Sequence, residues 1–441
     1  MNKEEAKGWR AFLLVLSMAV LWRPVAAGAD ELSDLKRELQ DQKARSAELE
    51  NRINQLEARQ RLEQRSLNDE IDAVEAKTEQ TGDTPKGLPD NLKWLEKIKV
   101  SGDFRYRYEY TDLEDQPTRN RNRIRARLMV SAIVNGEWDL VFRMATGETD
   151  IIDDTIIADP VSTNQTLGEF GSRKDFWLDL GYFDYHPAGI EGLNVLGGKI
   201  KNPFLMVGKN QLMWDSDLNP EGVGVTYSMP FGESVTVGLS GGGFWLNEES
   251  SGADTSLWGI QAHARTDLSD SDYALAGAGW YDYGNLQGLE DEFGIGFGNT
   301  IDPDTGAWVY DYDIFELLAE YGTQIGKVPV SIFGTWVKNC AAGNGEDTGW
   351  LVGATAGKAK NPGSYQFGYD YRDVERDAVL AAWNDSDFNA GRTGGEGHVL
   401  RFAYQAFKNV QFALTYFHSE ITDTDPELDY RRLQADVKLK F

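Results

Sequence analysis

Apolar and polar residues alternate with a period of two along most of this chain, and this alternation constrains the fold more than any other feature. The last nine residues show it most clearly. One face carries Leu433, Ala435, Val437, Leu439 and Phe441, and the other carries Gln434, Asp436, Lys438 and Lys440. A β-strand places successive side chains on opposite faces. One such segment would also fit a half-buried strand of a soluble sheet, but the pattern recurs back to about residue 98.

The segments with this pattern predict sixteen strands: 98–110, 121–134, 138–146, 176–186, 193–201, 222–228, 235–246, 256–265, 272–283, 314–322, 328–338, 349–357, 364–373, 398–407, 410–418 and 430–441. Short connections alternate with mostly longer ones, which is the layout of an outer-membrane barrel. A soluble sandwich or propeller does not need this alternation, and no repeat of fixed period supports a propeller. We therefore predict an all-β fold over residues 95–441: a transmembrane antiparallel β-barrel of about 16 strands. Side chains cannot fill a barrel of that size, so we expect an aqueous channel.

Composition excludes several other classes. The formal net charge of −27 argues against nucleic acid as a partner. A mean hydropathy of −0.47, with no long apolar run after the N-terminus, excludes a helical membrane protein. The single cysteine, Cys340, cannot form an internal disulfide. Four histidines are scattered without metal-ligand spacing, so we expect no metal and no cofactor.

The N-terminus has the features of a secretory signal peptide over residues 1–29. Lys3, Lys7 and Arg10 precede an apolar run, and an Ala-Gly-Ala sequence ends at Ala29. The alternative is a membrane helix, but the apolar run of about a dozen residues is too short to span a bilayer. The mature chain is expected to begin near Asp30.

Residues 30–80 follow a heptad pattern. Counted from Leu32, the a and d positions are Leu32, Leu35, Leu39, Gln42, Ser46, Leu49, Ile53, Leu56, Gln60, Glu63, Leu67, Glu70, Val74 and Lys77. A little over half are apolar and the rest of the segment is almost all polar, so we predict an α-helical coiled coil ahead of the barrel. A lone charged helix is the alternative. Residues 81–94, which contain Gly and Pro, are the predicted linker.

Arginines and aromatic residues occupy opposite faces of the first three predicted strands. Phe104, Tyr106, Tyr108 and Tyr110 share one face of the first strand, and we expect them to face outward. The other faces carry the predicted pore-lining basic stripe: Arg105, Arg107, Arg121, Arg123, Arg125, Arg127 and Arg143. Each arginine would cost about 2–4 kcal/mol if it faced lipid near the bilayer midplane. We therefore expect the stripe to line the lumen, where like charges this close require counter-charge or permeating anions.

The third long loop can supply that counter-charge. Residues 201–222 include two prolines and several apolar residues, which is unusual for a loop in solvent. We therefore expect this loop to fold inward against the wall. Asp215, Asp217 and Glu221 are its predicted constriction acids. The alternative is that these acids bind a cation at the outer rim.

Three segments carry a specific resemblance: KNPF…MWDSDLNPEG, RNRIRARL and the ending DYRRLQADVKLKF. They resemble the "putative porin" family of bacterial outer-membrane proteins over roughly residues 95–441, and a last strand ending in Phe is similar to the closing strand of such barrels. The resemblance implies passive diffusion of small hydrophilic solutes, without catalysis. Porins also suggest a homotrimer and a third loop whose acids face arginines on the wall, giving a narrow aperture that sorts solutes by size and charge.

Three functions stay open at this point. The first is a general diffusion porin in the outer membrane, with lipid around it and the coiled coil in the periplasm. The second is a channel selective for anions such as phosphate or a carboxylate. The third, of another class, is a structural anchor whose coil contacts peptidoglycan. Conductance separates a channel from an anchor, and ion selectivity separates the two channels.

Overall fold

The computed structural model describes residues 90–152, 155–250, 252–291 and 296–441. The predicted signal peptide, the predicted coiled coil and residues 81–89 of the predicted linker lie outside these ranges. Among the described residues, no helix is long and apolar enough to cross a membrane. A 3-10 helix, η1 (Asp90–Lys97), leads into the first strand.

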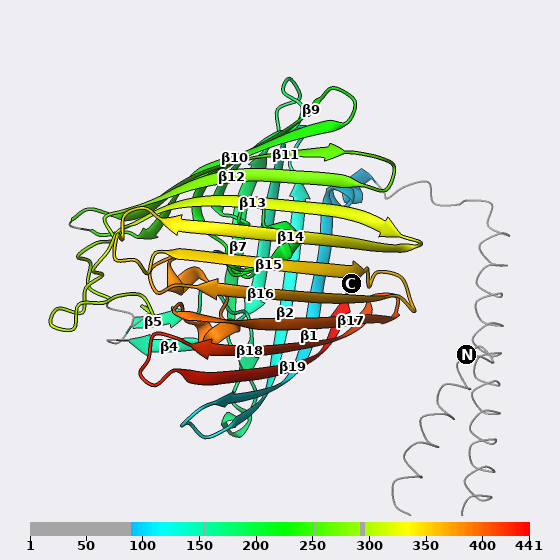
Figure 1. Cartoon of the computed structure of the whole chain (residues 1–441). Helices are drawn as coiled ribbons and strands as arrows, with labels where there is room; N and C mark the ends of the chain where they lie inside the picture. Colours follow the sequence, from blue (N-terminus) through cyan, green and yellow to red (C-terminus); the bar gives the residue numbers. More distant parts are fainter. Residues whose placement is uncertain (1–89, 153–154, 251, 292–295) are drawn as a thin grey trace, which may run out of the picture. The chain divides into compact units, whose positions relative to one another are not determined.

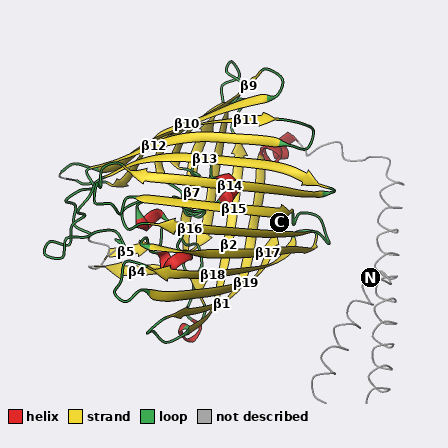
Figure 2. Ribbon diagram, in the orientation of Figure 1, coloured by secondary structure: helices red, strands yellow, loops and turns green. Residues whose placement is uncertain are grey.

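Sixteen long strands form one sheet (Figures 1 and 2). They are β1 (Ile98–Leu113), β2 (Arg119–Ile133), β3 (Trp138–Thr146), β7 (Phe176–Tyr185), β8 (Leu193–Lys199), β9 (Glu221–Phe231), β10 (Val235–Asn247), β11 (Thr255–Asp267), β12 (Tyr273–Gly284), β13 (Tyr312–Ile325), β14 (Val328–Asn339), β15 (Thr348–Gly357), β16 (Tyr365–Val374), β17 (Gly395–Phe407), β18 (Val410–Ile421) and β19 (Leu428–Lys440). Each of the sixteen predicted segments corresponds to one of them.

The first and last strands close the sheet into a barrel. Consecutive long strands pair antiparallel, and β1 also pairs with β19, with Asp103 opposite Lys440 and Leu113 opposite Tyr430. Every long strand of the described chain therefore has a neighbour on both edges. The predicted antiparallel barrel of sixteen strands is confirmed.

The two ends of the barrel differ in the length of their connections. One end carries short turns, such as 326–327 between β13 and β14 and 408–409 between β17 and β18. The other end carries the longest connections: 147–175, 200–220, 285–311 and 375–394. Within 147–175, β4 (Thr149–Ile152) and β5 (Thr155–Ala158) form a separate hairpin, and β6 (Gln165–Thr166) pairs with β2. The long loops gather at the left of Figure 1, and the C-terminus lies at the turn end.

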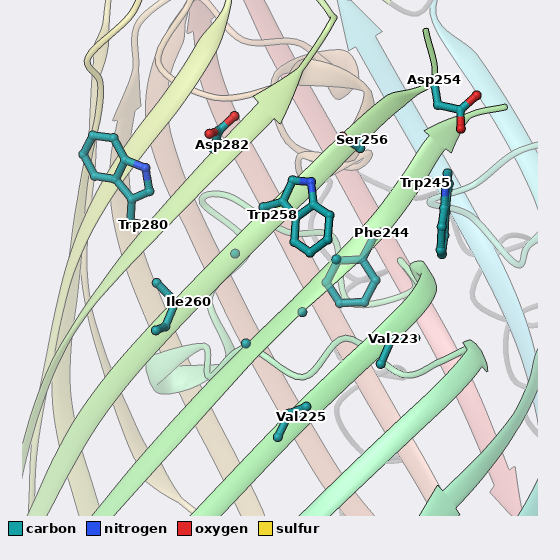
Figure 3. A pocket seen from close by; sticks show the side chains of 14 residues that line it. Val223, Val225, Phe244, Trp245, Asp254, Ser256, Trp258, Ile260, Trp280 and Asp282 are labelled. Carbon is teal, nitrogen blue, oxygen red and sulfur yellow. The ribbon is translucent and has the colours of Figure 1, made fainter. Parts of the chain in front are cut away.

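The outer face of the barrel is largely apolar and aromatic. On β1, Phe104 and Tyr106 are 40% and 41% exposed, whereas Arg105 between them is 8% exposed. This agrees with the predicted outward aromatic face of that strand. On β9 to β12, an outer groove of about 740 Å³ is lined by the glycines 241–243, and Trp258 and Ile260 also line it (Figure 3). Apolar side chains on the outside indicate that the barrel is surrounded by lipid.

A hydrophobic core lies inside the barrel, on one side of it. The loops 200–220, 285–311 and 375–394 contribute apolar side chains that pack against the inward faces of β10 to β16. Trp214 is 2% exposed, and its ring lies 5.3 Å from that of Tyr281 on β12 and 6.0 Å from that of Trp383. Loops therefore fill part of the interior that wall side chains cannot reach: the third long loop, which was expected to fold inward, and two further loops, for which no inward course was predicted.

Candidate functional site

The inward faces of β19, β1 and β2 form a wall of charged side chains. Strand register places Lys438 of β19 opposite Arg105 of β1, and Arg105 opposite Arg125 of β2. Neighbouring strands lie about 4.8 Å apart, so side chains in such a row are in close proximity. We use the name charged wall for eight basic residues whose side chains line the inside of the barrel on these three strands: Arg105, Arg107, Arg121, Arg123, Arg125, Arg127, Arg432 and Lys438. It contains six of the seven predicted stripe arginines.

Arg125 and Arg127 share two carboxylates. Asp103 lies 2.8 Å from each guanidinium group. Asp217, in the β8–β9 loop, lies 3.4 Å from Arg127 and 3.7 Å from Arg125. The hydroxyl of Thr163 donates a hydrogen bond of 2.9 Å to Asp217. One predicted loop acid therefore contacts the wall directly.

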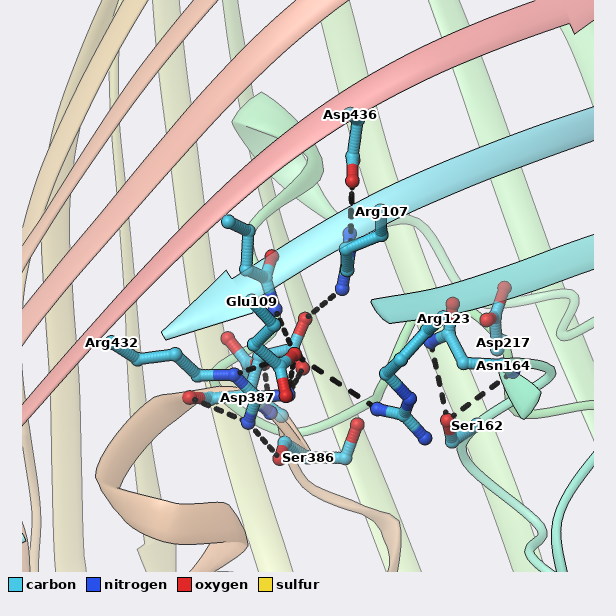
Figure 4. Close-up of polar contacts among 12 residues, drawn as sticks. Arg107, Glu109, Arg123, Ser162, Asn164, Asp217, Ser386, Asp387, Arg432 and Asp436 are labelled. Carbon is cyan, nitrogen blue, oxygen red and sulfur yellow. Dashed lines mark hydrogen bonds and ion pairs between the residues drawn. The ribbon is translucent and has the colours of Figure 1, made fainter. Parts of the chain in front are cut away.

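Glu109 lies in the middle of the charged wall and is fully buried (Figure 4). Arg121 donates to its carboxylate from Nε at 2.7 Å, and Arg432 donates from Nη2 at 2.5 Å. Arg123 lies 3.9 Å from Glu109 and 3.1 Å from Glu148. A buried charge is stable only when it is paired and hydrogen-bonded, and Glu109 meets that requirement with arginines from β2 and β19.

A second long loop reaches the same wall. Asp387, between β16 and β17, lies 2.7 Å from Arg432 and 3.4 Å from Arg107 (Figure 4). Arg107 also donates to Asp436 of β19 at 2.7 Å. With Glu148, the wall therefore receives one carboxylate from each of three loops that lie far apart in the sequence.

Arg105 and Arg143 differ from the other predicted stripe arginines in their partners. Arg105 donates to the side chain of Asn164, while the carboxylate of Asp436 is 4.0 Å away. Its buried Nε has no hydrogen-bond partner among the described residues. Arg143 of β3 forms an ion pair with Asp179 of β7, beside the charged wall rather than in it. Arg105 is consequently the wall arginine with the least counter-charge.

The β8–β9 loop crosses the inside of the barrel. The Gly208 N–H donates to Glu320 of β13 at 2.9 Å, and the Asn210 side chain donates to Thr335 of β14 at 3.1 Å. At the other end of the loop, Asp217 touches β2. The predicted inward course of this loop agrees with these contacts on two different walls.

The other two predicted acids do not contact the arginines. Asp215 is buried and accepts hydrogen bonds of 3.0 Å from the N–H and the hydroxyl of Ser386. Glu221 is the first residue of β9 and pairs with Lys199 at 2.7 Å. Strand alternation puts Glu221 on the same face as the exposed Val223 and Val225, so it points outward. The prediction that Glu221 faces the stripe is therefore wrong.

The sequence interpretation missed the inward course of residues 375–394. Arg372 of β16 binds Asp385 at 2.8 Å, and Phe388 is buried against Val399 and Phe417. These contacts anchor the loop and present Asp387 to the charged wall. The apolar run 378–383 is the signal that could have indicated an inward loop, as it did for residues 201–222.

The loop carboxyl groups have shifted pKa values. Burial alone would raise the pKa of Asp217, but the two guanidinium groups that it contacts outweigh burial and lower it. The same balance, with Arg432 as the strongest partner, lowers the pKa of Asp387. Burial, reinforced by Asp217 and Asp385, raises the pKa of Asp215 well above its ordinary value. Asp217 and Asp387 are therefore ionised at neutral pH.

This arrangement creates an electric field rather than a reaction centre. Guanidinium groups on the wall face carboxylates on the loops, and a low-dielectric surrounding strengthens such a field. The described residues contain no group of His, Cys, Asp and Glu side chains that could hold a metal ion.

Comparisons with known proteins agree on the type of barrel. A family model described as "Putative porin" matches residues 110–312 and 311–441. Among solved structures, OprB from Pseudomonas putida, determined at high pH, matches with a TM-score of 0.52 and 13% identity over 79% of this chain and 96% of that one. This likeness supports the fold alone.

Two further structures match less well. OmpF from Salmonella typhi, in complex with daunomycin, has a TM-score of 0.48 and 10% identity over 78% of this chain and 97% of that one. A triple mutant of the porin from Rhodopseudomonas blastica has a TM-score of 0.44 and 12% identity over 78% and 100%. No curated protein matches this chain.

Proposed function

The chain belongs to the putative porin family of outer-membrane channels, and from this premise we propose that it is a porin through which small hydrophilic solutes and ions diffuse passively. Proteins of this family and this fold are channels, not enzymes. The single observation that carries the proposal is Asp217: a loop carboxylate inside a closed barrel, 3.4 Å from an arginine of the wall.

The aperture in this proposal lies beside the contacts between the charged wall and the two inward loops, where the side chains of Arg127 and Asp387 are still 19% and 23% exposed. The loop 200–220 supplies Asp217 and the loop 375–394 supplies Asp387. Opposite charges on the two sides of a narrow passage produce a transverse field that orients polar solutes and repels apolar ones. The pore-lining role of the arginine stripe and the constricting role of the loops belong to this proposal.

A preference for anions is the second candidate, and the surroundings of Arg105 favour it. Its only described hydrogen-bond acceptor is a neutral amide, and Lys438 and Arg125 flank it in the same row. The wall therefore has more positive charge than the loop acids cancel. A phosphate or carboxylate would find the missing counter-charge there.

The proposal includes an assembly. A homotrimer is expected from the family resemblance, with the predicted coiled coil of residues 30–80 in the periplasm. Contact of that coil with peptidoglycan would add an anchoring role. Outer-membrane lipid would surround the apolar outer face.

Single-channel conductance in planar bilayers tests the proposal, with the reversal potential measured under a salt gradient. Large ohmic steps are expected, and the sign of the reversal potential gives the preferred ion. Asp217→Asn should shift selectivity toward anions. Glu221→Gln is the matched control, because that carboxylate points outward, and it should leave selectivity unchanged. Absence of current from a demonstrably folded barrel would contradict the porin and favour the structural anchor.

A further inference from the structure

Lys209 lies at the tip of the β8–β9 loop, inside the barrel and on strands other than those of the charged wall. We propose that Lys209 is a selectivity-determining residue of the channel, whose ammonium group attracts small anions such as phosphate or a carboxylate. The inference rests on the proposed function and adds to it a cation that the loop itself supplies.

The tip of this loop lies against the inner faces of three strands. The 3-10 turn η3 (Val207–Lys209) contacts β13, β14 and β15. The Gly208 N–H donates to Glu320 of β13 at 2.9 Å, and a Cβ added to Gly208 would lie 2.4 Å from the ring of Phe333 on β14. Strand alternation places both partners on inward faces, several residues from either end of their strands. The tip therefore reaches the middle of the wall from the inside.

Lys209 is exposed at this point, although residues on both sides of it are buried. Val207 is 1% exposed and Asn210 is 5% exposed, whereas Lys209 is in contact with solvent. The side chain of Asn210 fixes the turn, because it donates to the Val207 carbonyl at 2.7 Å and to the Thr335 hydroxyl at 3.1 Å. The closed wall separates the interior from lipid, so an exposed side chain on this tip projects into the water of the lumen.

The ammonium group of Lys209 also lacks the counter-charge that the wall cations have. Arg127, for example, pairs with Asp103 at 2.8 Å. No carboxylate of the described residues forms an ion pair with Lys209, and Glu320 instead accepts hydrogen bonds from the Gly208 N–H and the Tyr273 hydroxyl. A cation without a partner between low-dielectric walls attracts anions and repels other cations.

The backbone conformation of Lys209 is a further sign of function. Its φ of 56° lies in the left-handed region, where a residue with a Cβ is strained relative to glycine. Packing does not account for a lysine here, because its side chain is exposed. Such strain persists where the surrounding structure fixes the backbone, and it concentrates at functional sites. Gly208 and Asn210 fix the backbone on either side of Lys209.

Removal and chemical replacement of the charge test the inference. Lys209→Cys is made in a Cys340→Ser background, because Cys340 is exposed. Its reversal potential is measured under a salt gradient before and after treatment with 2-aminoethyl methanethiosulfonate, which restores an ammonium group, or with neutral methyl methanethiosulfonate. The anion-to-cation permeability ratio should fall about twofold or more in Lys209→Cys. The aminoethyl reagent should restore it, and the methyl reagent should not.

Lys360→Cys in the same background is the matched control. Lys360 is exposed in the turn between β15 and β16, outside the interior, where salt screens its charge. Its loss should leave the permeability ratio unchanged. If Lys209→Cys fails to fold, Lys209→Gly removes the same charge, suits the left-handed backbone and should give the same fall in the ratio.

Modification is also measured by mass, which needs no current. Protection of Lys209→Cys in the folded barrel would overturn the inference, because it would place this side chain away from water. An unchanged permeability ratio in a conducting Lys209 variant would overturn it as well and leave the porin intact. A parent barrel that carries no current would contradict the proposed function, and the selectivity role of Lys209 with it.

Discussion

Asp387 illustrates how one carboxylate can stabilise the fold and, in the proposed pore, also act on selectivity. It lies between two buried guanidinium groups, and its side chain is still 23% exposed. The paired charges satisfy Arg432 and Arg107, which would otherwise be buried without enough counter-charge. In the proposed pore, the exposed part of the carboxylate would contribute negative potential to the passage.

Replacing Asp387 by Asn should therefore shift the reversal potential toward anion preference. Loss of the charged hydrogen bonds should also lower the free energy of unfolding by about 1–3 kcal/mol. Asp304→Asn is a suitable control, because that carboxylate is exposed in the β12–β13 loop. Unchanged selectivity in Asp387→Asn, with normal folding, would remove this residue from the passage.

The lowered pKa of Asp387 gives a pH dependence with a definite sign. A carboxyl group whose folded pKa lies below the ordinary value of 3.8 stabilises the fold above that value. The stabilisation is lost as pH falls from about 3.8 toward the folded pKa. We expect the difference in reversal potential between the parent and Asp387→Asn to be equal at pH 7.5 and pH 5.5, and the melting temperature of the parent to fall below about pH 4. Asp387→Asn should show a smaller fall over the same acid range.

Residue positions on strands could be predicted, whereas loop partners could not. Arg125 and Arg127 lie on a strand, where parity alone decides the face. Glu221 was misassigned because it was treated as part of the loop, although β9 begins there and parity with Val223 turns it outward. Asp387 has no periodicity to read, because its position depends on contacts with Arg432 and other distant residues.

At the scale of elements, aromatic side chains of the inward loops and of the strands pack against each other inside the barrel. Trp214 contacts Phe204, Tyr281 and Trp383, which come from its own loop, from β12 and from the second loop. The apolar composition of 201–222 indicated that this loop folds inward. The strands that this loop would contact could not be predicted, because the sequence pattern carries no information on contacts between segments far apart in the chain.

Trp214→Ala should leave a cavity at the centre of this packing. The expected loss is about 3–5 kcal/mol, as for other large-to-small substitutions in cores. Trp258→Ala is the matched control, because Trp258 is 63% exposed on the outer face. Urea titration of both variants in the same lipid or detergent measures the difference. Equal losses would mean that the interior packing contributes little to stability.

At the scale of the whole molecule, the barrel has two apolar regions separated by its own wall. One faces outward over the strands, and the other fills part of the interior. The sequence pattern predicted the apolar outer face and the closed sheet, because the alternation along each strand identifies its two faces. It predicted the second region only in part: the apolar composition of 201–222 indicated one inward loop, whereas the apolar contributions of 285–311 and 375–394 were not predicted.

Substitutions on β17 and its neighbour β18 can test which face of these strands contacts lipid. Leu400 is 50% exposed on the outer face, whereas Arg401 points inward. Leu400→Arg should weaken folding into phospholipid vesicles by about 2–4 kcal/mol. Thr415→Arg places the same side chain inside, opposite Arg401, and should cost less stability than Leu400→Arg. Equal folding of both arginine variants would contradict a lipid-facing outer surface on these strands.

The pairing of β1 with β19 differs from the other pairings of long strands only in lacking a peptide connection. Its ladder includes the ion pair of Arg107 with Asp436, residues 329 positions apart. A circularly permuted protein, with new termini in the turn at 408–409 and with residue 441 joined to residue 95, should therefore form the same barrel. In the natural order, every incomplete chain keeps two unpaired strand edges, which can pair with other chains until the final strand has been synthesised.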